Sequence, residues 1–161
     1  MALMDAKEYD PRPAQRRLRL VLIAIALLIV LLVLWFWPSG HFRFWSQWRV
    51  ADHFFVALEQ KDFEKAYGIY QADPDWKQHP QKYSSYGLSQ FTLDWGPSGE
   101  FGAITSHRVD CAMKPKSNSS GVVVVVTINN TAATHSIWVE SKSKSITAPS
   151  PVGDVACHGQ Q

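Results

Sequence analysis

The residues best suited to chemistry or ligand binding are concentrated in one polar and aromatic segment, residues 70–86. The candidate ligand-binding residues in it are Asp75, Trp76, His79 and Tyr83. Acid–base catalysis of the isomerase type needs a carboxylate in an apolar pocket opposite a hydroxyl donor. Asp75 with Tyr83 would supply such a pair. A solvated loop, with Trp76 and Tyr83 packed over neighbouring helices, also explains the segment, and we favour it.

Two further places carry side chains of the same kinds. Asp94 beside Trp95 is a second candidate carboxylate. His107 lies in a predicted strand, where alternation puts it on one face with Val109 and Cys111. From that face it would project into the interior as a general base or a pH-sensitive group. The alternative, a structural or solvent-facing histidine, is the commoner case.

No motif assigns a reaction. The sequence has no nucleophile elbow, no phosphate-binding loop and no pair of carboxylates at a catalytic spacing. His53, His107 and His135 are single on their predicted elements, so no pair has the spacing of metal ligands. We therefore assign no catalytic residue and predict neither a metal nor a cofactor.

The elements that would position these residues change type half-way along the chain. Apolar residues at helical spacing predict helices at 48–60, 63–70 and 84–95, with Asp62 as the N-cap of the second. After a turn at 96–99 the pattern alternates, which predicts an antiparallel sheet behind the helices. Five consecutive valines mark its buried central strand. The predicted strands are residues 101–113, 122–129, 134–141 and 145–148.

An apolar run, residues 20–37, precedes this α+β part. It contains no charged or polar side chain, no Gly and no Pro, and as a helix it reaches roughly 27 Å, close to the hydrocarbon thickness of a bilayer. It is the pattern of a transmembrane helix, with Pro38 as its stop. The residues before the run form a polar tail that we expect to be disordered.

Flanking charges predict the orientation. The first 40 residues hold five basic and three acidic residues, most of the bases next to the run, so the positive-inside rule places the N-terminus in the cytoplasm. A cleavable signal peptide is the alternative, and it also sends residues 41–161 across the membrane. The remainder holds eleven bases and eleven acids, which leaves no basic surface for a nucleic acid.

Two cysteines, Cys111 and Cys157, fall in the exported part. An even pair in an oxidising compartment is most simply one disulfide, and two free thiols are the alternative. The bond would close a loop of about 45 residues and contribute on the order of 3–4 kcal/mol.

Residues 50–70, VADHFFVALEQKDFEKAYGIY, resemble the opening helices of the NTF2-like, cystatin-like superfamily, and FGAITSHRV at 101–109 with the valine strand resembles its curved sheet. The resemblance implies a cone of about three helices packed on a curved antiparallel sheet, with a pocket at its open end. Residues 70–86 would then lie near the pocket rim. It also points to membrane-anchored bacterial members, hence to the inner membrane and a periplasmic or extracellular domain. It implies no single activity.

The sequence thus predicts a non-catalytic, single-pass membrane protein whose exported domain binds a protein partner near the bilayer surface or a small apolar ligand. One alternative is an isomerase or dehydratase that uses the cone pocket, and another is a scaffold subunit of an envelope or secretion assembly. The predicted parts are a cytoplasmic tail (1–19), a transmembrane helix (20–37), an aromatic segment (38–47), the exported domain (48–148) and a C-terminal tail (149–161).

Overall fold

The computed structural model describes residues 12–36, 43–116 and 118–157, with side chains of the first helix at residues 19–33. The chain forms two compact units, Met1–Arg43 and Phe44–Gln161. The predicted helix stop at Pro38 and the ends of both predicted tails lie outside the described residues.

The first unit contains helix α1 (Arg12–Phe36). It begins eight residues before the apolar run, so the prediction of a disordered tail is wrong for residues 12–19. Pro13 does not prevent this, because the first turn of a helix needs no N–H from it. Taken over the residues and side chains that the structure describes, no helix is long and apolar enough to cross a membrane. The transmembrane helix stays a prediction.

The second unit begins with the predicted helix pair, α2 (Trp45–Glu59) and α3 (Phe63–Gln71). Asp62 caps α3 as predicted, because its carboxylate accepts a hydrogen bond from the Lys65 N–H at 3.0 Å. The short connection keeps the two helices in contact and brings their apolar faces together.

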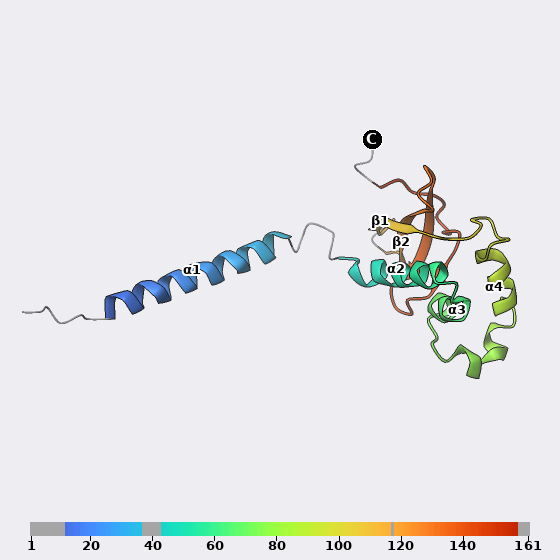
Figure 1. Cartoon of the computed structure of the whole chain (residues 1–161), viewed down its shortest axis with the longest axis horizontal. Helices are drawn as coiled ribbons and strands as arrows, with labels where there is room; N and C mark the ends of the chain where they lie inside the picture. Colours follow the sequence, from blue (N-terminus) through green and yellow to red (C-terminus); the bar gives the residue numbers. More distant parts are fainter. Residues whose placement is uncertain (1–11, 37–42, 117, 158–161) are drawn as a thin grey trace, which may run out of the picture. The chain divides into compact units, whose positions relative to one another are not determined.

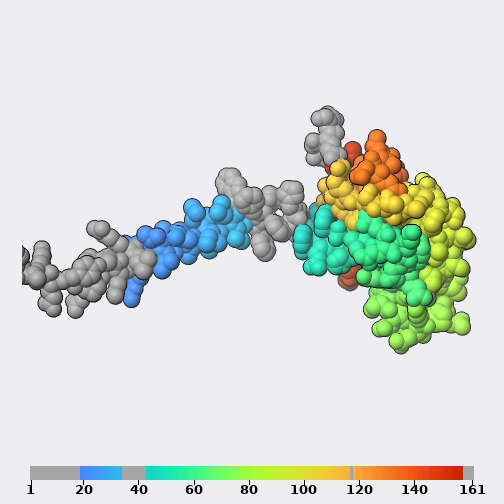
Figure 2. Space-filling view, viewed as in Figure 1, coloured from blue at the N-terminus to red at the C-terminus, as the bar shows by residue number. Residues whose placement is uncertain are grey.

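Two single turns and a short helix follow. The turns are η1 (Trp76–Gln78) and η2 (Pro80–Tyr83), and the helix is α4 (Leu88–Trp95). Helix α4 starts four residues later than predicted because Gly87 has an extended backbone and serves as its N-cap. The segment of η1 and η2 forms the lower edge of this unit in Figure 2.

The sheet is an antiparallel meander in the order β1-β2-β3-β4. Figure 1 shows α2 lying across one of its faces, and α2 contacts β1, β2 and β3. Helices on one face of an antiparallel sheet confirm the predicted α+β class. The strands are β1 (His107–Met113), β2 (Gly121–Ile128), β3 (Thr134–Glu140) and β4 (Ile146–Thr147).

Strand β2 is buried along its whole length, which explains the valine run. Val122, Val124 and Val126 pack with the helices in the main core. Val123 and Val125 face the other way and pack with Trp138 in a second cluster that includes Val155 and Cys157 of the C-terminal segment. A strand covered on both sides has no polar face, so its side chains do not alternate in polarity.

The first predicted strand begins six residues later than expected, at His107. The preceding segment is held as a loop by the side chain of Asn129, which follows β2. Its Oδ1 accepts the N–H of Thr105 at 2.8 Å, and its Nδ2 donates to the carbonyl of Ala103 at 3.0 Å. These bonds replace the ladder that a longer strand would need.

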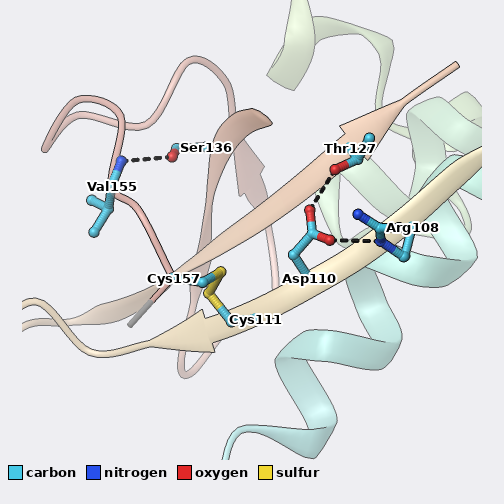
Figure 3. Close-up of a disulfide and its surroundings, with 7 residues drawn as sticks. All are labelled: Arg108, Asp110, Cys111, Thr127, Ser136, Val155 and Cys157. Carbon is cyan, nitrogen blue, oxygen red and sulfur yellow. Dashed lines mark hydrogen bonds and ion pairs between the residues drawn. A yellow bond between two sulfur atoms is a disulfide. The ribbon is translucent and has the colours of Figure 1, made fainter. Parts of the chain in front are cut away.

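A β-bulge at Asp110 corrects the face predicted for Cys111. The register of β1 shifts between Val109 and Cys111. Val109 therefore packs on the helix side, and Cys111 turns to the opposite face. The Asp110 carboxylate, only 2% exposed, accepts hydrogen bonds from Thr127 at 2.6 Å and Arg108 at 2.7 Å (Figure 3).

The predicted disulfide between Cys111 and Cys157 is present, with the two Cα atoms 6.0 Å apart. Figure 3 shows it joining β1 to the C-terminal segment. The Val155 N–H donates to the Ser136 hydroxyl at 3.1 Å and attaches the same segment to β3. The C-terminal residues thereby cover the face of the sheet that the helices leave open.

Candidate functional site

The predicted segment 70–86 is organised by Asp73. Its Oδ2 accepts a hydrogen bond from the Tyr83 hydroxyl at 2.6 Å, and His79 Nδ1 lies 3.4 Å and Lys82 Nζ 3.6 Å from the same oxygen. Its Oδ1 accepts the Asp75 N–H at 3.0 Å. Asp75 itself is exposed and contributes only its backbone to this network. The carboxylate opposite Tyr83 is therefore Asp73.

These contacts have an electrostatic signature. The hydrogen bond from Tyr83 lowers the pKa of Asp73 most, and the Asp75 N–H, Lys82 and His79 lower it further against the effect of burial. A carboxyl with a lowered pKa stabilises the fold above its unfolded pKa, and the contribution disappears as pH falls through the folded value. The network ties the segment that contains η1 and η2 back to Asp73 at the end of α3.

Trp76 packs on α3. Its ring meets Tyr67 edge-on at 4.9 Å, and a Cβ on Gly68 would lie 3.3 Å from its Cδ1 atom. Trp76 also lines an open groove of about 650 Å³ together with Val50, Ile69 and Lys77. Of the four residues predicted here, Trp76 alone borders this groove, and Tyr83 is buried.

His107 belongs to a different cluster. Its Nδ1 lies 2.7 Å from Glu59 and its Nε2 3.3 Å from Asp52, two carboxylates spaced two turns apart on α2. Phe55 stacks on the ring from between them, and the His107 side chain is 7% exposed. Both nitrogens are occupied, so this arrangement suits joining α2 to β1 and not proton transfer.

Replacing His107 by alanine is expected to lower the free energy of unfolding by about 2–3 kcal/mol, because it leaves a cavity and two partly buried carboxylates without their donor. Urea unfolding of the chain in a nonionic detergent measures the change. His53→Ala is the control, because His53 is an exposed histidine on α2, the helix that His107 contacts, and its loss should cost no more than about 0.5 kcal/mol. Equal losses in the two variants would contradict the role given to His107.

A second cavity, of about 550 Å³, lies where α4 ends and contains residues that the sequence did not bring together. Its lining contains aromatic side chains from four segments and three carboxylates. We call it the α4 pocket and define it by Phe55, Tyr86, Asp94, Trp95, Glu100, Phe101, His135 and Asp154.

Local sequence explains how these residues meet. A turn at 96–99 reverses the chain after α4, and a Cβ on Gly99 would lie 1.9 Å from the Asp94 carbonyl oxygen, so only glycine fits. Phe101 then packs on Trp95 at 5.4 Å and on His135 at 4.7 Å. The Asn129 side chain donates toward the Phe101 carbonyl at 3.4 Å and helps to fix that loop.

The α4 pocket contains one hydroxyl–carboxylate pair. Tyr86 donates to Asp94 Oδ2 at 2.9 Å, and Gln90 donates to Asp94 Oδ1 at 2.8 Å. Burial raises the pKa of Tyr86 strongly, and the hydrogen bond to Asp94 adds to the rise. Tyr86 therefore keeps its proton at neutral pH. Each oxygen of Asp94 thus accepts one hydrogen bond and keeps a lone pair for a further donor.

Comparison with protein families, curated proteins and solved structures finds no match. The NTF2-like resemblance therefore remains a prediction. Among the described residues, no group of three or more His, Cys, Asp or Glu side chains is arranged to hold a metal ion. The sequence named Asp94 and Trp95 as a candidate pair, but not the loop, strand and tail residues that complete the pocket with them.

Proposed function

We propose that this protein is a membrane-anchored, exported domain that binds a small ligand in the α4 pocket without transforming it. The observation that carries the proposal is the pocket itself, a cavity of about 550 Å³ lined by both aromatic side chains and carboxylates. Ligand sites are concave, mostly apolar and few per protein. The resemblance of residues 50–70 to NTF2-like domains supports the same use.

Binding is favoured over catalysis by how the interior is filled. Phe54, Phe55 and Phe91 are fully buried between the helices and the sheet, and Tyr67 nearly so. The apolar space in which an isomerase would enclose its substrate is occupied by these side chains. The Tyr86–Asp94 pair is the observation that favours the isomerase alternative.

Filling the pocket tests the binding role. Ser98 lines the cavity and is exposed, so Ser98→Trp should occupy it without disturbing the core. We expect the amount of small molecule that co-purifies with the full chain in nonionic detergent to be about ten-fold lower in the variant. Native mass spectrometry and solvent extraction measure this amount. Ser85 is exposed and lines neither the groove at Trp76 nor the α4 pocket, so Ser85→Trp is the matched control. An equal yield from both variants would remove the pocket as the site.

The anchor part of the proposal rests on the uncharged run at 20–37 and on α1, whose described side chains, residues 19–33, are all exposed. Apolar side chains exposed along a helix have to be covered by another apolar phase or surface. A bilayer fits a run of this length.

A topology reporter checks the anchor. We expect alkaline phosphatase fused after Gln161 to be active in bacterial cells and a green fluorescent protein at the same position to be dark, because the positive-inside rule exports the C-terminal end. The fusion should also sediment with membranes. The control lacks residues 20–37, and its phosphatase should be inactive. Activity of the phosphatase without the run would contradict the anchor.

A further inference from the structure

We propose that the α4 pocket selects a small organic cation, an amine or ammonium group carried on an apolar body. This inference rests on the proposed function, since it names the class of ligand for the same site. It is carried by the charge of the lining, by two carboxylates without partners and by the aromatic surfaces beside them.

The lining is acidic. Asp94, Glu100 and Asp154 contribute carboxylates, and no lysine or arginine lines the cavity among the residues that the structure describes. The remaining titratable side chains of the lining are Tyr86 and His135. An anion would meet three negative charges, so the electrostatic complement of this pocket is a cation.

Two of the three carboxylates have no partner. Within the described part of the chain, Glu100 and Asp154 make no hydrogen bond and no ion pair. Asp75 is the one other described carboxylate in that state, whereas Asp52, Glu59, Asp73, Asp94 and Asp110 all accept hydrogen bonds. The two unpartnered carboxylates beside the cavity are therefore available to an incoming donor.

The aromatic side chains supply the second half of the recognition. Phe101 and Tyr86 are half-buried, whereas Trp95 is buried and supports Phe101, with the two ring centroids 5.4 Å apart. An ammonium group over an aromatic face is attracted by the ring quadrupole.

Three probes with one indole body and different end groups separate charge from shape. They are tryptamine, tryptophol and indole-3-propionate, which are a cation, a neutral alcohol and an anion. We titrate each into the full chain in nonionic detergent by calorimetry. Tryptamine is expected to bind about ten-fold more tightly than tryptophol, because it adds a cation–π contact and a partly exposed ion pair. Indole-3-propionate should bind least, and added salt should weaken only tryptamine.

Charge-neutral variants test the carboxylates directly. Glu100→Gln with Asp154→Asn should raise the Kd of tryptamine about five-fold and change that of tryptophol less than about two-fold. Both residues are exposed, so the fold should tolerate the changes, and unchanged tryptophol binding verifies it. Asp75→Asn removes a carboxylate that is outside the pocket and should leave all three Kd values unchanged.

The outcomes separate the two proposals. Tryptamine selectivity that falls in the double variant supports a cation site. If tryptophol binds as tightly as tryptamine, or if the double variant retains full selectivity, the cation inference is overturned while the pocket remains a binding site. If none of the three probes binds, the small-ligand function fails, and the cation inference fails with it.

Discussion

Replacing Phe91 by alanine is expected to lower the free energy of unfolding by about 3–5 kcal/mol, the range for losing a buried phenylalanine. Phe91 lies on α4 and is fully buried. Its ring is the meeting point of the aromatic core, with five neighbouring rings at centroid distances of 5.3–6.4 Å. The truncation would leave a cavity, because the neighbouring rings belong to several elements and cannot all move in to fill it. Thermal unfolding followed by near-ultraviolet circular dichroism measures the loss.

Two variants bracket this prediction. Phe91→Leu keeps most of the apolar volume and should cost about 1–2 kcal/mol. Leu93→Ala, two residues further along the same helix, removes a side chain that is 57% exposed and should change stability by less than about 0.5 kcal/mol. A Phe91→Ala loss no larger than that of Leu93→Ala would show that α4 does not depend on this contact.

Local signals were enough to predict the helix pair and the central strand. Helical spacing at 48–60, the carboxylate of Asp62 and the valine run are each legible within a few residues, and short-range physics decides them. The disulfide was predictable because the chain contains two cysteines and one simple pairing. These features required no knowledge of which distant segments meet.

Long-range contacts explain what the sequence could not provide. The alternating pattern at 101–106 resembles a strand, but the Asn129 side chain, over twenty residues later, holds the backbone there as a loop. The bulge at Asp110 reverses the face of Cys111, and one extra residue in a ladder leaves no mark in an apolar pattern. Local propensity therefore predicts a first strand that is six residues too long. Strict alternation along that strand puts Cys111 on the wrong face of the sheet.

The candidate site shows the same limit. Sequence proximity identified the segment around Tyr83, yet the carboxylate that Tyr83 contacts is Asp73 and not Asp75. His107 was recognised, but its partners Asp52 and Glu59 are some fifty residues earlier in the chain. The residues that define the α4 pocket come from α2, the segment before α4, α4 itself, the following loop, β3 and the C-terminal segment. A site assembled from six segments carries no spacing signature.

Removing the disulfide has the second large expected effect. Cys111→Ser with Cys157→Ser should lower the free energy of unfolding by about 3–4 kcal/mol, because the bond restrains the unfolded chain across a separation of 46 residues. Each single variant should lose the same amount as the double variant, since all three lack the one bond. Wild-type protein unfolded in the presence of a reductant should match them. Losses that add between the single variants would show that the cysteines act through packing and not through the bond.

The disulfide should also influence the proposed cation site. Cys157 attaches the C-terminal segment to β1, and Asp154, three residues before it, lines the α4 pocket. Val155 packs on the second cluster in between, with its N–H bonded to Ser136. Without the disulfide this short segment is held by few contacts, so the Asp154 carboxylate should spend less time at the pocket. We therefore expect the double serine variant, at a temperature where it is folded, to bind tryptamine less tightly and tryptophol as before. Equal weakening of both probes would mean that the bond supports the shape of the pocket and not its charge.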